Sequence, residues 1–134
     1  MIGSLVILLT IAIQALVLNQ AAHWIDRWAL RLLPRRGDPA RLALLMAGAV
    51  WVLFAMTLQV WLWALLLLKL GALHTLESAI YFALVVFTTV GFGDLILPPD
   101  WRLLSGMIGA DGLLIFGWST AFMVELVRRL RGGP

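Results

Sequence analysis

Long apolar segments dominate this chain and decide what it can fold into. Three of them run from Ile2 to Leu18, from Leu42 to Leu68 and from Leu103 to Val127. Each is long enough to cross the hydrocarbon core of a bilayer as a helix, which takes roughly 17–25 residues. Because 63% of the residues are hydrophobic and only 13% are charged, a soluble domain of this length could not bury them. The sequence therefore predicts an all-α membrane protein with three transmembrane helices.

A fourth apolar segment, from Leu76 to Phe87, is too short to cross a membrane. As a helix it would measure about 18 Å, so we expect it to be re-entrant. The non-helical backbone that follows is tolerated at membrane depth only where it is buried in protein or lines a watery path. Thr75 is a suitable N-cap for this helix, and Glu77 suits the positive end of its dipole. The lengths alone indicate a pore loop or a cavity.

The residues after the short segment have a pattern suited to binding a dehydrated cation: Thr88-Thr89-Val90-Gly91-Phe92-Gly93-Asp94. Glycine adopts the left-handed backbone conformation that L-residues resist. Gly91 and Gly93, at alternate positions, therefore allow neighbouring carbonyl groups to turn to the same side. A row of such oxygens replaces the water around an ion, and the Thr89 hydroxyl adds one more oxygen.

The segment from Glu77 to about Arg129 resembles the pore module of tetrameric potassium channels, of the small bacterial type with two transmembrane helices. The heptad matches that family's Thr-Thr-Val-Gly-Tyr-Gly-Asp at every position except Phe92, where tyrosine is most common. The N-terminal membrane helix is additional to the family's simplest architecture. The resemblance implies a homotetramer that conducts K⁺ passively, with no organic cofactor and no enzymatic activity.

The same resemblance assigns roles within the loop. It implies that K⁺ is coordinated by Thr89 to Phe92, that Thr88 supports the base of the loop and that Asp94 buttresses its mouth. Two bracing contacts of the family are missing, because Val85 replaces a glutamate that in some members pairs with the aspartate, and Phe92 has no hydroxyl. We expect an aromatic side chain to hold the aspartate instead, the candidates being Trp101, Tyr81 and Phe82.

The basic residues are distributed unevenly between the two sides of the predicted membrane. Only Lys69 and Arg102 lie on the side of the loop, whereas the other side holds eight: Arg27, Arg31, Arg35, Arg36, Arg41, Arg128, Arg129 and Arg131. The positive-inside rule then predicts a cytoplasmic 23–41 connection and C-terminus, an N-terminus outside, and a filter that opens outward. We expect the protein in a bacterial inner membrane.

The predicted organisation has three parts. Residues 1–22 form an N-terminal transmembrane helix, which lacks the basic start and the cleavage site of a signal peptide. Residues 23–40 form a cytoplasmic interfacial linker. Residues 41–131 form the pore module, divided into an outer helix (41–70), a pore helix (75–87), a filter (88–94) and an inner helix (102–130).

The linker has two interpretations. His23 to Leu33 has the pattern of an amphipathic helix that lies on the inner leaflet and passes force to the channel helices. The alternative, which we favour, is a simple anchoring turn that meets anionic lipid headgroups through four arginines: Arg27, Arg31, Arg35 and Arg36.

Two residues of the last segment are candidates for a role in the cavity or in gating. Asp111 is its only acidic residue at depth, and we expect it to face an inner cavity as a ring of carboxylates that attracts cations. The alternative is a hydrogen bond to the pore helix or Thr120. Gly112 is a candidate gating hinge, the alternative being close helix packing, for which Gly109 is better suited.

Two further expectations concern contacts between helices and at a helix end. Thr10 and Gln14 give the first segment a polar stripe that would meet Gln59 or Thr57 of the second. Glu125 would form ordinary helix-end ion pairs with the two arginines that follow it one turn later, Arg128 and Arg129.

Other functions fit parts of the pattern. Gly91 to Asp94 also satisfies the Gly-x-Gly-Asp signature of intramembrane aspartyl proteases, but that chemistry needs a second carboxylate, and Asp111 is the only one at depth. A non-selective monovalent cation channel and a non-conducting membrane scaffold are the remaining alternatives. No regularly spaced arginines of a voltage sensor occur in any segment, so the sequence does not predict the gating stimulus.

Overall fold

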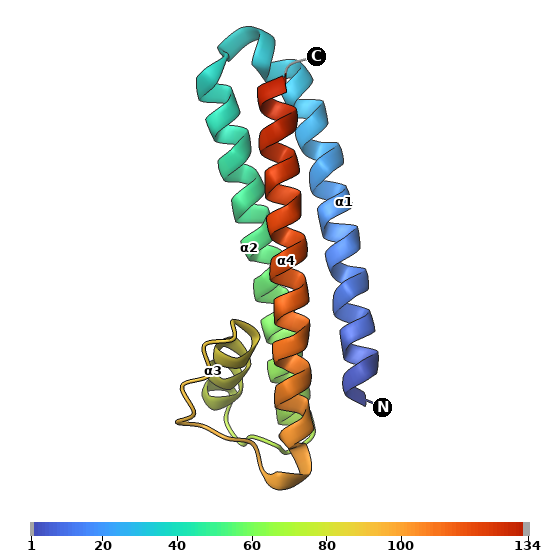
Figure 1. Ribbon diagram of the computed structural model, residues 1–134, viewed down its shortest axis with the longest axis vertical. Coiled ribbons are helices and arrows are strands. Elements are labelled where there is room, and N and C mark those ends of the chain that lie inside the picture. The colour runs from blue at the N-terminus through green and yellow to red at the C-terminus, as the bar shows by residue number, and fades with distance from the viewer. Residues whose placement is uncertain (1, 133–134) are drawn as a thin grey trace.

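The computed structural model describes residues 2–132, apart from the side chains of residues 33–36 and 132, which include Arg35 and Arg36. These residues form four α-helices, one 3₁₀ turn and no strand, in the order α1 (Ile2–Arg36), α2 (Asp38–Lys69), α3 (Leu76–Phe87), η1 (Pro99–Trp101) and α4 (Arg102–Gly132) (Figure 1). Three of the helices, α1, α2 and α4, are long and apolar enough to cross a membrane. This confirms the predicted all-α class.

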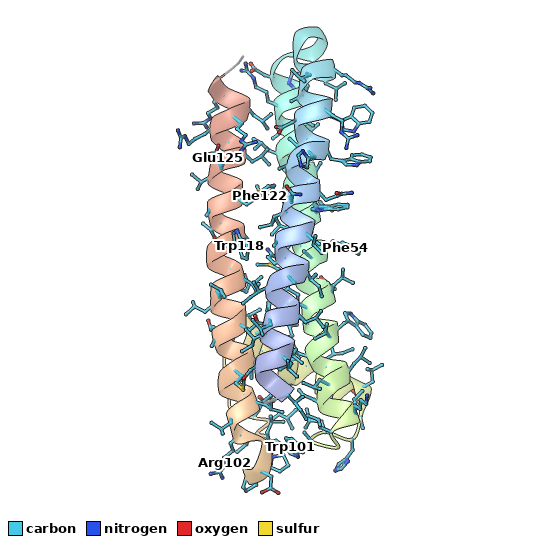
Figure 2. All side chains as sticks on the ribbon, turned by 90° about the vertical axis from the view of Figure 1, so that its right-hand side faces the viewer. Phe54, Trp101, Arg102, Trp118, Phe122 and Glu125 are labelled. Atoms are coloured by element: carbon cyan, nitrogen blue, oxygen red, sulfur yellow. The ribbon has the colours of Figure 1, made fainter. Side chains whose placement is uncertain are left out.

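The three long helices lie side by side, and the short helix α3 packs at one end of them (Figure 1). The N-terminus lies at the same end as α3, whereas the α1–α2 turn and the end of α4 lie at the opposite end. Figure 2 looks onto α1, which lies in front, between α4 and α2. The basic segments and the 88–94 loop are therefore at opposite ends of the molecule.

The connection between α1 and α2 is a tight turn. Because α1 continues without a break to Arg36, the separate amphipathic helix predicted over His23–Leu33 is wrong. No proline or glycine lies between Gly3 and Pro34, so the apolar and amphipathic parts merge into one helix. The chain reverses at Gly37, whose φ of 54° is the left-handed conformation that glycine adopts freely, and Pro39 suits the first turn of α2.

Two helix caps set the position of α3. At the end of α2, Gly71 adopts a φ of 67°, and the amide of Ala72 donates to the carbonyl oxygen of Leu67 at 3.0 Å, which closes a Schellman motif. At the start of α3, the Thr75 hydroxyl accepts from the amide of Ser78 at 3.2 Å. The predicted N-cap is confirmed, and the chain enters α3 at a fixed point.

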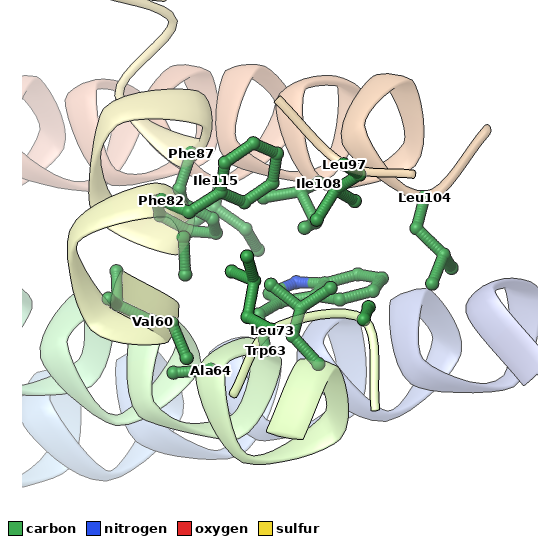
Figure 3. Packing of buried hydrophobic residues seen from close by; sticks show 14 residues of the cluster. Val60, Trp63, Ala64, Leu73, Phe82, Phe87, Leu97, Leu104, Ile108 and Ile115 are labelled. Atoms are coloured by element: carbon green, nitrogen blue, oxygen red, sulfur yellow. The ribbon is translucent and has the colours of Figure 1, made fainter. Parts of the chain in front are cut away.

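The largest apolar cluster lies where α2, α3 and α4 meet (Figure 3). Trp63 of α2 is fully buried and lies near Phe82 and Phe87 of α3 and Ile108 and Ile115 of α4. A smaller cluster of Ile25, Leu44, Leu126 and Leu130 joins α1, α2 and α4 at the other end. The short helix is thus fixed against two long ones by large side chains, which positions the loop that follows it.

The last residue of α3 lies close against α4 at Gly112. A Cβ atom there would overlap the carbonyl oxygen of Phe87, the last residue of α3, whereas one on Gly109 would make ordinary contacts with Val86, the nearest at 3.7 Å. The expectation that Gly109 is the better packing residue is therefore wrong. Close packing, the alternative to a gating hinge, accounts for a glycine at position 112.

Buried amide and hydroxyl groups hold α1 to the other long helices. Gln59 Nε2 of α2 donates to Gln14 Oε1 of α1 at 2.7 Å, and Gln14 Nε2 donates to Ser119 Oγ of α4 at 2.8 Å. All three side chains are buried. The predicted contact between the polar stripe of the first helix and Gln59 is confirmed. Because hydrocarbon offers polar groups no water, such partners must come from the protein itself.

The carboxyl group of Asp111 belongs to a second buried cluster. Its Oδ1 accepts from Thr10 Oγ1 of α1 and its Oδ2 accepts from Trp63 Nε1 of α2, both at 2.8 Å. With 1% of the residue exposed, the prediction that Asp111 faces an inner cavity is wrong. The alternative partner is wrong as well, since the Thr120 hydroxyl donates to Phe116 O of its own helix. Two donors on α1 and α2 satisfy the carboxyl oxygens, and this orients the side chain away from α3.

We predict that Thr10→Val lowers the midpoint of thermal unfolding in detergent, because it removes a donor to the buried Asp111 carboxyl. The expected loss is about 1 kcal/mol. Thr57→Val is the matched control, since the exposed Thr57 hydroxyl donates only to Leu53 O of its own helix. Equal unfolding midpoints for the two variants would contradict this account of how α1 is attached.

The contact at Gly112 gives a second prediction. Gly112→Ala should lower the unfolding midpoint by the equivalent of about 1–3 kcal/mol, because the added methyl group must push the end of α3 away. Gly106→Ala, on the same helix, has open space around its Cβ and should leave the midpoint unchanged or raise it. Full stability of Gly112→Ala would show that the two helices separate at little cost.

Candidate functional site

The backbone of the 88–94 loop alternates in handedness. Thr89, Gly91 and Gly93 have φ values of 61°, 57° and 78°, whereas Val90 and Phe92 between them are not in the left-handed region. This alternation turns successive carbonyl groups toward the same side of the strand. The two glycines were predicted to serve this purpose. The left-handed conformation of Thr89 was not predicted, because a β-branched residue resists it.

The amide groups at the base of the loop donate back to the end of α3. Thr89 N donates to Val86 O at 2.9 Å, and the amides of Val90 and Gly91 both donate to Val85 O, at 3.0 and 3.2 Å. These hydrogen bonds use the amide groups at the base of the loop and hold its backbone against the end of α3. Among residues 2–132, no donor reaches the carbonyl oxygens of residues 89–92, so these acceptors remain available for a ligand.

Thr88 is the transition between helix and loop. Its amide donates to Leu84 O at 3.0 Å, and its hydroxyl donates to the same oxygen at 2.8 Å. The C-terminal end of α3 carries the partial negative charge of the helix dipole, and this end lies directly at the base of the loop. Its electrostatic effect favours a cation there.

Asp94, at the end of the loop, is held by an aromatic residue of α3. Tyr81 Oη donates to Asp94 Oδ2 at 2.6 Å, and the amide of Leu95 donates to Asp94 Oδ1 at 3.1 Å. Of the three aromatic candidates, Tyr81 is the partner, and Phe82 is buried in the core. The hydrogen bond to Asp94 is the main cause that raises the pKa of Tyr81 above its ordinary value. The phenol therefore stays protonated, and able to donate, at physiological pH.

A small hollow lies behind the loop, between α3 and the start of α4. It is lined by Val85 and Tyr81 of α3, by Gly91 and Gly93 of the loop and by Ser105 of α4, among others. Val85 contributes only apolar surface there. The side-chain hydrogen bond that connects α3 to the far end of the loop is therefore the one between Tyr81 and Asp94.

The loop itself is on the surface of the single chain. Val90 and Phe92 are 55% and 71% exposed, and the residues from Thr89 to Asp94 are all exposed. Among residues 2–132, no group of three or more His, Asp or Glu side chains could hold a metal ion. The ligands that this site offers to a cation are therefore backbone carbonyls, with one threonine hydroxyl.

The other predicted site residues lie away from the loop or beside it. Asp111 is directed toward α1 and α2, and Gly112 touches the last residue of α3. At the far end of α4, Glu125 pairs with Arg129 at 3.0 Å and with Arg128 at 3.6 Å, as predicted. Arg129 also reaches Asp26 of α1 at 3.3 Å, a contact that spacing along one helix could not reveal.

Sequence reasoning missed Trp63 as a structural partner. The ring of this tryptophan is fully buried, and its indole N–H donates to Asp111 Oδ2. A buried tryptophan needs an acceptor for its N–H, and Asp111 was the one strong acceptor at comparable depth. That pairing was a signal available in the sequence.

Comparison with known proteins agrees with the architecture. A family model described as an ion channel matches residues 42–129, well over half of the chain. The matched range runs from α2 through the 88–94 loop to the end of α4 and leaves α1 outside. No curated protein and no solved structure matches. With three helices able to span a membrane and this match over most of its length, the protein is a multi-pass membrane protein that belongs to the ion channel family.

Proposed function

We propose that this ion channel is selective for potassium and conducts K⁺ passively through a homotetrameric pore. The observation that carries the proposal is the alternating handedness of Thr89 to Gly93, with the carbonyl oxygens of residues 89–92 left without donors. K⁺ would bind to the oxygens of Thr89, Val90, Gly91 and Phe92. Thr88 would support the base of the filter, and Gly93 and Asp94 its outer end.

The geometry of one chain supports the proposed tetramer. A single strand presents oxygens from one side only, and its exposed face would leave most of the ion in water. Closing a ring of oxygens takes several identical strands around an axis, and cyclic symmetry supplies them. Four strands are the number used by the potassium channels that the heptad resembles.

The distribution of charge supports an orientation. The arginine-rich ends of α1 and α4 and the α1–α2 turn lie together, opposite the filter loop. We infer that this end is cytoplasmic, so that the filter opens outward and the N-terminus lies outside. A bacterial inner membrane is the proposed location, and anionic headgroups are the proposed partners of the basic end.

The alternatives make different demands on the same residues. A non-selective cation channel would tolerate a wider or looser loop. The unbroken Gly-x-Gly-Asp end of the loop and the Tyr81–Asp94 hydrogen bond favour the selective channel. A protease would need two carboxylates that share one site. Asp111 bonds to Thr10 and Trp63 and Asp94 bonds to Tyr81, which gives no support to such a pair.

We predict that Gly91→Ala lowers the ratio of K⁺ to Na⁺ flux in proteoliposomes to near one. An L-residue resists a φ of 57° by about 1–2 kcal/mol, so the strand would relax and turn carbonyl groups away from the ion. Gly71→Ala is the matched control, because it introduces the same backbone strain at a φ of 67° in the turn after α2. Unchanged selectivity in Gly91→Ala, or an equal loss in Gly71→Ala, would be evidence against the filter.

A further prediction concerns the brace. Tyr81→Phe removes the hydroxyl that donates to Asp94 and should make K⁺ flux decay faster after the external K⁺ concentration is lowered. Trp101→Phe is the control. It changes an aromatic candidate that does not bond to Asp94, and its flux should decay as that of the wild type does. The time course of barium-sensitive flux measures both. Identical decay in the two variants would mean that the hydrogen bond does not support the filter.

A further inference from the structure

The last third of α1 carries an aromatic and basic face that conduction does not use. Trp24, Arg27, Trp28 and Arg31 follow each other at spacings of three, one and three residues, which places all four on one side of the helix. Together they line one shallow hollow on the surface of the molecule. Trp24 and Trp28 are 56% and 40% exposed, with ring centroids 6.2 Å apart.

The positive charge on this face has no acidic counterpart. Arg31 lies over the ring of Trp28, with its Cζ 5.9 Å from the centroid, and Arg27 Nε donates to the backbone oxygen of His23. The one acidic residue of this stretch, Asp26, is on the opposite face of the helix, where it pairs with Arg129 of α4 at 3.3 Å. Among the described residues, neither Arg27 nor Arg31 forms an ion pair, so both guanidinium groups are available for an anion.

An apolar groove adjoins the basic hollow. It is formed by Gln20, Ala21, Trp24 and Ile25 of α1 and by Ala47 and Trp51 of α2. The two alanines leave room between the helices, and Trp51 closes one side because its indole N–H donates to Val17 O at 3.0 Å. Trp24 lines both the groove and the basic hollow, so the two form one continuous surface.

We infer that this surface is a binding site for one anionic phospholipid. The lipid phosphate would lie between Arg27 and Arg31, whose fork-shaped guanidinium groups suit phosphate oxygens. One acyl chain would lie along the α1–α2 groove, with the ring of Trp24 at the boundary between headgroup and chain, where tryptophan is favoured. Charge complementarity selects an anionic headgroup, and the apolar groove selects an amphiphile over a free anion. The inference depends on the membrane location of the chain and not on its ion selectivity.

The test is lipid binding by the full-length protein in detergent, followed by native mass spectrometry. We expect phosphatidylglycerol to bind at least tenfold more tightly than phosphatidylcholine with the same acyl chains. The double variant Arg27→Gln/Arg31→Gln should weaken phosphatidylglycerol binding roughly ten- to thirtyfold and bring it to the level of phosphatidylcholine. Equal binding of the two lipids by the wild type would overturn the proposal.

Two further variants distinguish binding at this site from a non-specific effect of positive charge or of apolar surface. Arg41→Gln/Arg128→Gln removes the same charge from the same end of the molecule, from arginines that pair with Asp38 and Glu125, and should change binding less than twofold. Ala47→Trp fills the groove at an exposed position and should weaken phosphatidylglycerol binding although both site arginines remain. A loss in the first variant as large as in Arg27→Gln/Arg31→Gln, or no loss in Ala47→Trp, would contradict the site.

Glycerol phosphate distinguishes a lipid site from a site for any phosphate. It should not displace phosphatidylglycerol at millimolar concentration, because it lacks the chain that occupies the groove. Displacement by it would reduce the site to a surface anion site. The Arg27→Gln/Arg31→Gln variant could instead form complexes with a different number of chains and still bind the lipid. That result would show that the aromatic and basic face of α1 contacts other copies of the chain, and it would overturn the proposal.

Discussion

Hydrogen-bond satisfaction in a medium without water is the constraint on which this structure depends. The long helices satisfy their backbone groups internally, which is why helices span membranes. The polar side chains that α1, α2 and α4 bury bond to one another, through Gln14, Gln59 and Ser119 and through Thr10, Trp63 and Asp111, although Gln59 Oε1 has no partner among the described residues. The 88–94 loop departs from this rule in its backbone. The amides of Thr89, Val90 and Gly91 donate to the end of α3, whereas the carbonyl oxygens of residues 89–92 have no donor, and the partner that we propose for them is a dehydrated cation.

The inner helix α4 connects that loop to the rest of the molecule through two neighbouring residues. Gly112 allows the end of α3 to lie directly on α4, so the base of the loop is fixed by backbone contact. Asp111, one residue earlier, points the other way and binds α1 and α2. Since one side of α4 supports the loop and the other side is held by α1, the N-terminal helix is part of the same packed unit as the segment that matches the ion channel family. The Asp26–Arg129 ion pair makes a second connection between α1 and α4 at the far end.

The features that follow from local rules were predictable from the sequence. Segment lengths predicted the three long helices and the short α3, Thr75 predicted the start of α3, and the alternating glycines predicted the form of the loop. The heptad also predicts the site, and its proposed chemistry is in the backbone, so that it depends little on distant residues. The gap between the predicted spans was misread, because a hydrophobicity pattern marks where a helix leaves the membrane and not where the helix ends. Helix α1 continues to Arg36, and the positive φ of Gly37 then allows the chain to turn.

The errors inside the membrane have a different cause. The position of Asp111 depends on which way α4 is rotated, and periodicity along one apolar helix does not fix that rotation. It is set by partners on two other helices, Thr10 and Trp63, which lie 101 and 48 residues away in the sequence. The same holds for Gly112 and Gly109, which differ in packing only because the end of α3 contacts one of them closely. Long-range contacts of this kind require the tertiary structure.

The central claim, a potassium-selective pore, is tested most directly by the reversal potential of the wild-type protein in a planar bilayer with K⁺ on one side and Na⁺ on the other. A selective filter predicts a barium-sensitive current whose reversal potential is shifted strongly toward the K⁺ equilibrium potential. A barium-sensitive current that reverses near zero would contradict the claim and would assign the same loop to a non-selective cation pore.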